Sequence, residues 1–98
     1  MEQDPAGIHD WHAHIYYDPA TKPRASALRE RLGTLFPVRL GRMHDVPVGP
    51  HPQAMFQIAF APDALPAVVP WLALNRDGLT VLVHPEATDA VADHRDHA

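Results

Sequence analysis

The order of the hydrophobic patterns constrains the fold of this chain more than any other feature. Four short stretches have the alternation or the aliphatic and aromatic content of β-strands, and two longer ones have apolar residues at helical spacing. The predicted strands are residues 11–17, 38–44, 55–60 and 79–83, and the predicted helices are residues 23–35 and 64–75. The order β-α-β-β-α-β is typical of a ferredoxin-like α+β sandwich, in which two helices cover one face of an antiparallel sheet.

The residues at the helix ends support these ranges. Thr21 can cap the first helix and Asp63 the second, because short polar side chains accept hydrogen bonds from the free N–H groups of a first helical turn. The predicted apolar faces are Ala25, Leu28, Leu32 and Leu35 in the first helix, and Leu65, Val68, Val69 and Leu72 in the second. Residues 1–10 and 86–98 lack such periodicity, which predicts a flexible arm and a polar tail on a single domain spanning residues 1–98.

The predicted topology also orders the strands. From the handedness of crossover connections, we expect strand 55–60 to lie beside strand 11–17 and parallel to it. Strand 79–83 should lie on the other side, antiparallel to strand 11–17. The loop that precedes strand 55–60 would then lie at the same end of the sheet as the beginning of the first strand.

The composition of the chain limits its possible partners, location and oligomeric state. The 98 residues carry a net charge of −4 without a basic stripe, which argues against a nucleic-acid partner. The absence of cysteine excludes disulfides and thiolate metal sites and, with an acidic N-terminus unlike a signal peptide, predicts a cytoplasmic location. No apolar run approaches the roughly 20 residues of a membrane helix. Because so small a domain buries a modest fraction of its surface, we expect a homodimer.

Histidine occupies alternate positions of the first predicted strand. Successive side chains of a strand point to opposite faces, so His12 and His14 share one face. Ala13 and Ile15 share the other, which is apolar enough to cover a core. The two imidazoles would lie about 7 Å apart, because each residue advances roughly 3.3 Å. One metal ion could bind both rings, but a strand with histidines on its solvent-facing side explains the pattern as well.

Two further histidines favour the first explanation. His84 ends the last predicted strand and His51 lies in the loop before the third, so the predicted topology gathers them with His12 and His14 at one end of the sheet. Histidine is the commonest metal ligand in proteins, and imidazoles without thiolates suit Fe(II), Zn, Cu or Ni. A metal or catalytic site is therefore the preferred interpretation of the four histidines.

Carboxylates have no obvious place in this predicted cluster. The acidic residues nearest to the histidines in sequence are Asp18, Asp45 and Glu86. A site of three histidines is therefore the simpler prediction, instead of the two-histidine, one-carboxylate pattern of many iron oxygenases.

The remaining histidines carry weaker signals. His44 could equally be a turn residue or a site residue, and His94 lies in a polar tail that could fold over the site. His9 and His97 are expected to be exposed.

Four blocks of this sequence resemble the DOPA 4,5-dioxygenase family. They are Trp-His-Ala-His-Ile-Tyr-Tyr-Asp at 11–18, Pro-Val-Gly-Pro-His-Pro at 47–52, Asn-Arg-Asp-Gly-Leu-Thr-Val-Leu-Val-His-Pro at 75–85, and Asp-His at 93–94. The resemblance implies a ferredoxin-like subunit, a homodimer, and extradiol cleavage of a catechol ring with iron and O₂. Carried over residue by residue, it selects His12, His14, His51, His84 and His94.

With this resemblance, the histidines can be assigned roles. We expect His12, His14 and His84 to bind Fe(II) or another divalent metal. His51 and His94 are the predicted catalytic residues, His51 as an acid/base or fourth ligand and His94 as a residue behind the ligands. The alternative hypothesis is a non-catalytic dimeric ferredoxin-like module that binds a metal or a small aromatic ligand, because a fold does not determine a function.

Overall fold

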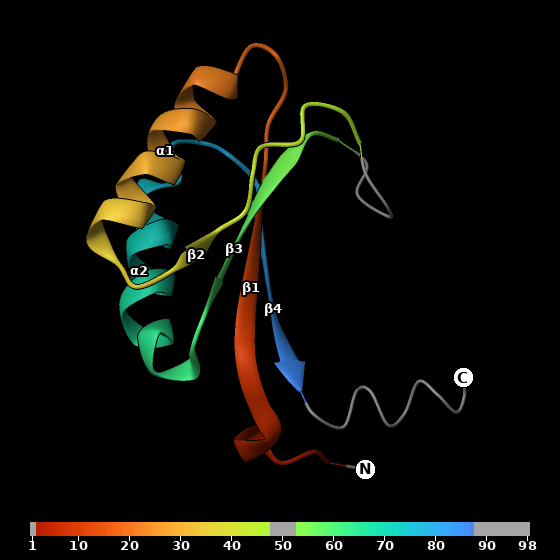
Figure 1. Ribbon diagram of the computed structural model, residues 1–98, viewed down its shortest axis with the longest axis vertical. Coiled ribbons are helices and arrows are strands. Elements are labelled where there is room, and N and C mark those ends of the chain that lie inside the picture. The colour runs from red at the N-terminus through yellow and green to blue at the C-terminus, as the bar shows by residue number, and fades with distance from the viewer. Residues whose placement is uncertain (1, 48–52, 88–98) are drawn as a thin grey trace.

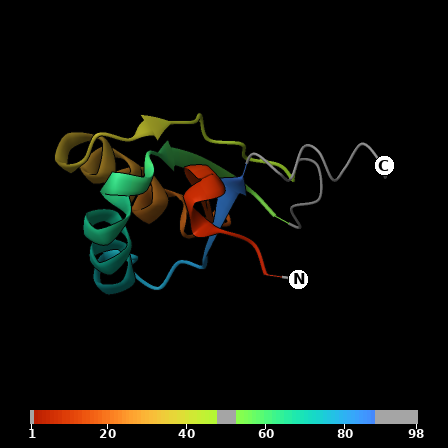
Figure 2. The ribbon, with the colours of Figure 1, turned by 90° about the horizontal axis from the view of Figure 1, so that it is seen from below.

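The computed structural model describes residues 2–47 and 53–87 of the chain, and Figure 1 shows the arrangement of its elements. In chain order these are η1 (Pro5–Gly7), β1 (Ile8–Tyr16), α1 (Lys22–Leu35), β2 (Arg39–Leu40), β3 (Met55–Phe60), η2 (Pro62–Ala64), α2 (Leu65–Asn75) and β4 (Val81–Ala87). The strands form one sheet in the order β2-β3-β1-β4 with antiparallel neighbours. Both helices cover the same face of the sheet (Figure 2), which confirms the predicted ferredoxin-like fold.

The core lies between this face and the helices. Ala13 and Ile15 of β1 have no exposed surface, so their predicted position against the core is confirmed. The buried side chains that meet them are Phe56, Ile58 and Phe60 of β3, Ala25, Leu28 and Leu32 of α1, and Val68 and Leu72 of α2. These helical residues belong to the predicted apolar faces. Neither helix of residues 2–47 and 53–87 covers the opposite face of the sheet, and the side chains of that face form the candidate site.

Ile58 offers a test of this core. We expect Ile58→Ala to lower the free energy of unfolding by about 2–5 kcal/mol, because the fully buried side chain would leave a cavity that its neighbours fill only in part. Leu74→Ala is the matched control, since Leu74 is 86% exposed on α2 and should change the stability by less than about 0.5 kcal/mol. Chemical denaturation of both variants makes the comparison, and equal losses would contradict the assignment of the core.

The direction of β3 differs from the prediction. β1 and β3 are antiparallel neighbours, with Trp11 opposite Phe60 and Tyr16 opposite Met55. The crossover rule governs β1 and β2, which helix α1 connects and which run parallel, but β3 follows β2 as an antiparallel strand. The start of β3 therefore lies beside the end of β1. The argument that placed His51 at the beginning of β1 is wrong, and His51 itself lies outside the described residues.

The boundaries of three strands also differ from the prediction. β1 begins at Ile8, so part of the predicted arm of residues 1–10 belongs to the sheet. β2 has two residues in place of the predicted 38–44, and a single bridge between His44 and Met55 follows it. β4 begins and ends later than predicted, and continues through Pro85 to Ala87. Proline has no backbone N–H group. It is tolerated at position 85 because β4 is an edge strand, where the nitrogen of such a residue can face away from the sheet.

Neither helix has the predicted side-chain cap. Thr21 precedes α1, but its hydroxyl accepts a hydrogen bond from the backbone N–H of Asp18 at 2.9 Å and does not cap the helix. The Asp18 carboxylate accepts hydrogen bonds from the backbone N–H of Thr21 at 2.9 Å and from the Thr21 hydroxyl at 3.1 Å, and these two bonds lower the pKa of Asp18. Asp63 lies within the short turn η2, so Ala64 occupies the cap position of α2.

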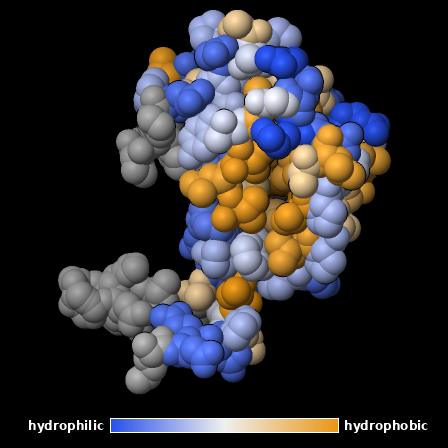
Figure 3. All heavy atoms as spheres, turned by 180° about the vertical axis from the view of Figure 1, so that it is seen from behind, coloured by the Kyte–Doolittle hydropathy of each residue, from blue (hydrophilic) through white to orange (hydrophobic). Residues whose placement is uncertain are grey.

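The two faces of β4 have opposite character. On the helix side, an apolar groove of about 200 Å³ separates β4 from α2, and Figure 3 shows the hydrophobic surface around it. Its lining includes Val81 and Val83, which were predicted to face the helices. The polar residues of β4 lie on the other face.

Within residues 2–47 and 53–87, no helix has the length and apolar character needed to cross a bilayer.

Candidate metal site

Side chains of β1 and β4 meet in pairs on the helix-free face of the sheet. Residues directly opposite each other in antiparallel strands have Cβ atoms about 4.5–5.5 Å apart, so these pairs are close neighbours. The pairs are Asp10 with Glu86, His12 with His84, and His14 with Leu82. The first pair continues the register of the other two, and the register shifts beyond it, between Ile8 and Asp10, where an extra residue in β1 forms a bulge.

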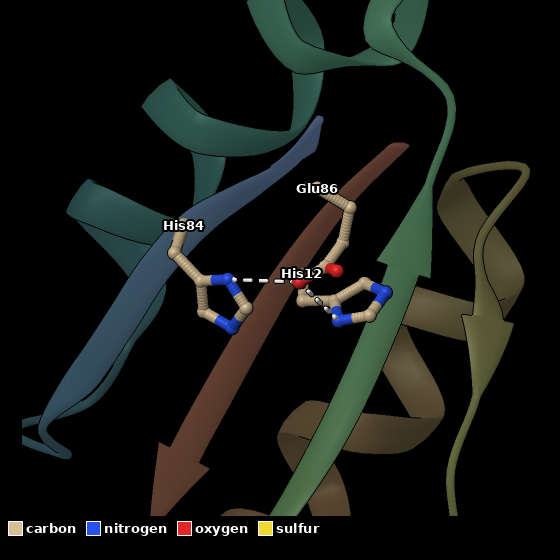
Figure 4. Close-up of side chains that lie close together, drawn as sticks. All are labelled: His12, His84 and Glu86. Atoms are coloured by element: carbon tan, nitrogen blue, oxygen red, sulfur yellow. Dashed lines mark ion pairs between the residues drawn. The ribbon is translucent and has the colours of Figure 1, made fainter. Parts of the chain in front are cut away.

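His12, His84 and Glu86 converge most closely. One potential ligand atom from each residue lies within 4.8 Å of the others. The Glu86 Oε2 atom is 3.6 Å from Nδ1 of His12 and 3.3 Å from Nδ1 of His84, so the carboxylate lies between the two imidazoles (Figure 4). The ring centroids are 5.3 Å apart with an interplanar angle of 73°. This arrangement can present two nitrogen atoms and one oxygen atom to the same ion.

The presence of Glu86 corrects the sequence interpretation, which gave no carboxylate a place in the cluster. The prediction ended the last strand at His84 and Pro85 and assigned Glu86 to the tail. In the structure both residues belong to β4, and their spacing of two places them on the same face. The other carboxylates considered are engaged elsewhere: Asp18 with Thr21, and Asp45 with the Tyr17 hydroxyl at 2.7 Å and the Lys22 ammonium group at 2.8 Å.

His14 joins this cluster through His84. The two Nε2 atoms lie 3.0 Å apart, and the rings are nearly parallel with centroids 5.1 Å apart. At that distance one Nε2 atom carries a proton and donates a hydrogen bond, and the other Nε2 atom accepts this bond with its lone pair. His14 is only 5% exposed. The structure therefore places His12, His14 and His84 on one face. His84 contacts His12 and Glu86 on one side and His14 on the other.

Asp10 is a second acidic residue that the sequence analysis did not select. Its Oδ2 atom lies 3.3 Å from Nε2 of His12 and also forms an ion pair with Arg39 of β2. Burial alone would raise the pKa of Asp10, but the hydrogen bond and charge of Arg39, together with His12, outweigh it and leave this pKa below its ordinary value. Asp10 is therefore an anion at neutral pH. Its position two residues before His12 was the available sequence signal.

The other predicted histidines lie apart from the cluster or outside the described residues. His9 is exposed, as predicted. His44 is half-buried and pairs with Met55, which is opposite Tyr16 at the far end of β1 from Asp10. His51, His94 and His97 fall outside residues 2–47 and 53–87, so the predicted roles of His51 and His94 stay predictions.

Fold and site together define a ferredoxin-like domain with a candidate two-histidine, one-carboxylate metal site on its open sheet face. The family model described as the Dopa 4,5-dioxygenase family matches residues 11–98. The chain belongs to this family, which confirms the resemblance found in the sequence. The family is named after a dioxygenase, a member of the oxidoreductase class.

Individual relatives agree with this assignment. The chain is 33% identical over 96 residues to a DOPA 4,5-dioxygenase from Amanita muscaria, a match that covers 89% of this chain and 42% of the relative. It is 40% identical over 93 residues to an uncharacterized 21.2 kDa protein from Botryotinia fuckeliana, covering 86% of this chain and 51% of that protein. The chain thus spans about half the length of these curated relatives.

A solved structure supports the fold. The crystal structure of a proposed dioxygenase from Nostoc punctiforme is similar to this chain with a TM-score of 0.87 and 53% sequence identity. The match covers 95% of this chain and 81% of the other.

Proposed function

We propose that this chain carries an extradiol dioxygenase site, in which O₂ cleaves a catechol ring with the help of a divalent metal, Fe(II) in the first instance. The observation that carries the proposal is the convergence of His12, His84 and Glu86 within 4.8 Å in a member of a dioxygenase family. The catechol, such as DOPA, and O₂ would be its small-molecule partners. A homodimer in the cytoplasm is also part of the proposal.

The donor atoms fit such a metal. Two imidazole nitrogens and one carboxylate oxygen form the ligand type found in many non-haem Fe(II) oxygenases, whose remaining positions stay open. Thiolates, which would favour other metals and clusters, are absent from the whole sequence. When bound, Fe(II) would supply the electron-transfer chemistry that lets O₂ react with a catechol. His12, His84 and Glu86 would hold it.

His14 has two possible roles in this proposal. It was predicted to be a third imidazole ligand, and its Nε2 atom lies 3.0 Å from Nε2 of His84. If His14 and His84 both held the metal through these nitrogens, neither Nε2 atom could keep the proton that they share. If His12, His84 and Glu86 held it instead, His14 would keep a proton beside the site. His84 is common to both arrangements, whereas Glu86 and His14 belong to one each.

The proposed reaction needs proton transfer but no external reductant. Both atoms of O₂ enter the product as the ring C–C bond beside the diol breaks, giving one aldehyde and one carboxyl group. A base takes a proton from the catechol, and an acid returns one to the opened ring. Histidine can do both near pH 7, because its neutral imidazole takes a proton and the imidazolium that results can return one. His51 and His94 remain the predicted residues for these steps, and His14 is the described residue best placed to assist.

Oxygen uptake tests the proposal directly. We expect the protein loaded anaerobically with Fe(II) to consume about one O₂ per catechol and to form a yellow ring-opened product. The same protein loaded with Zn(II) is the control, since zinc has no redox chemistry and should support no turnover. Fe(II) binding without O₂ uptake across a panel of catechols would contradict the proposal and favour the non-catalytic module that binds a metal or a small aromatic ligand.

A further inference from the structure

We propose that Asp10, held by Arg39, is a positioning residue that fixes the orientation and tautomer of His12, with its Nδ1 lone pair directed at the metal. This inference rests on the proposed function, because it takes His12 as a metal ligand. Nothing in the family resemblance selects either Asp10 or Arg39. The two nitrogen atoms of the His12 ring face different carboxylates, and this difference supports the proposal.

The His12 ring lies between two carboxylates. Its Nδ1 atom is 3.6 Å from Oε2 of Glu86, and its Nε2 atom is 3.3 Å from Oδ2 of Asp10. A neutral imidazole has one N–H donor and one lone pair, so the two sides of the ring cannot have the same role. An N–H on Nε2 would point towards the Asp10 anion. The lone pair on Nδ1 would then point towards Glu86 and His84.

A histidine that binds a metal commonly donates its second ring N–H to a carboxylate, which fixes the tautomer and increases the basicity of the ligand nitrogen. The Asp10–His12 contact has this form. His84 shows the matching arrangement, because its Nδ1 atom faces Glu86 at 3.3 Å while its Nε2 atom faces His14. Both imidazoles thus turn Nδ1 towards the carboxylate and have a partner on the other nitrogen.

Arg39 explains why Asp10 stays in place. The Arg39 guanidinium on β2 forms an ion pair with Oδ2 of Asp10, the same oxygen that contacts His12. Strand β3 lies between β2 and β1, and its residue Ala59 is opposite both Arg39 and His12. The ion pair therefore crosses β3 at an alanine, whose small side chain leaves room for it. A surface ion pair adds little stability by itself, so this arrangement fits a positioning role better than a purely stabilising one.

The tautomer of His12 can be measured in the metal-free wild-type protein. Long-range ¹⁵N–¹H correlation spectra, recorded near pH 8.5 where imidazoles are neutral, distinguish a proton on Nε2 from one on Nδ1. We expect the proton on Nε2 in the wild type and a mixture of tautomers in Asp10→Ala. A proton on Nδ1 of His12 in the wild-type protein would overturn the proposal, whether or not any variant folds.

Metal affinity provides the second measurement. Asp10→Ala should weaken Zn(II) binding by about 10–100-fold, the usual cost of losing an outer partner of a metal ligand, without changing the number of ions bound at saturation. Arg39→Gln should weaken it less. Glu30→Ala, which removes an exposed carboxylate of α1, is the matched control and should bind Zn(II) as the wild type does.

His12→Ala separates the two proposals. If His12→Ala binds Zn(II) as tightly as the wild type, His12 is not a ligand and the proposed site itself fails. If His12→Ala loses binding while Asp10→Ala keeps both wild-type affinity and the wild-type tautomer, only the positioning role of Asp10 fails. Chemical denaturation of Asp10→Ala and Arg39→Gln should show folded proteins, so that a change in affinity reports on the site.

Discussion

Replacement of His84 by alanine is expected to abolish high-affinity metal binding. Both candidate ligand sets contain His84 together with His12, and His84 contacts members of each set, since its Nδ1 atom faces Glu86 and its Nε2 atom faces His14. Loss of an outer partner costs about 10–100-fold in affinity, so loss of a ligand should cost more than about 100-fold. Titration with Co(II) or Zn(II) against a competing chelator measures the change, and Fe(II)-dependent O₂ uptake should disappear with it.

His9→Ala is the matched control for this experiment. It removes an imidazole from β1 at an exposed position, within the bulge and outside the cluster, and should leave affinity and uptake unchanged. Equal losses in both variants would show that the metal binds to surface histidines without a defined site. Wild-type affinity in His84→Ala would contradict every ligand set considered for this chain.

Much of the fold could be predicted because hydrophobic spacing reports directly on burial. The apolar residues of strand β3 alternate as expected, and Phe56, Ile58 and Phe60 are fully buried. The direction of β3 was not encoded in such spacing. A strand shows the same alternation whichever way it runs, so the direction depends on the connections, and the crossover rule was applied to the wrong pair of strands.

The predicted His12, His14 and His84 do lie on one face, but for a partly different reason. The prediction placed them near strand ends, whereas cross-strand pairing puts His12 opposite His84 within the body of the sheet. This outcome needed only the antiparallel pairing of β1 with β4, which was correct. The placement of His51 needed a parallel β3, and that argument failed.

Glu86 was missed because a proline was taken to end a strand. Pro85 removes one backbone donor, but on an edge strand this donor faces away from the sheet and costs no ladder hydrogen bond. Continuing the alternation past Pro85 would have placed Glu86 on the face of His84. Asp10 was missed because the prediction began the first strand at residue 11, whereas β1 begins at Ile8 and its alternation places Asp10 on the face of His12.

Comparison of Glu86→Gln with His14→Ala should decide which ligand set holds the metal. We expect Glu86→Gln to weaken Co(II) binding by more than about 100-fold, because the amide keeps the shape of the side chain but lacks the anionic oxygen that lies between the two imidazoles. His14→Ala should cost less, about 10–100-fold, since His14 would then be an outer partner that contacts the ligand His84 through Nε2. The absorption spectrum of bound Co(II) should change in the first variant and persist in the second. The reverse result, with binding lost in His14→Ala and kept in Glu86→Gln, would establish the three-histidine set predicted from sequence and remove Glu86 from the ligands.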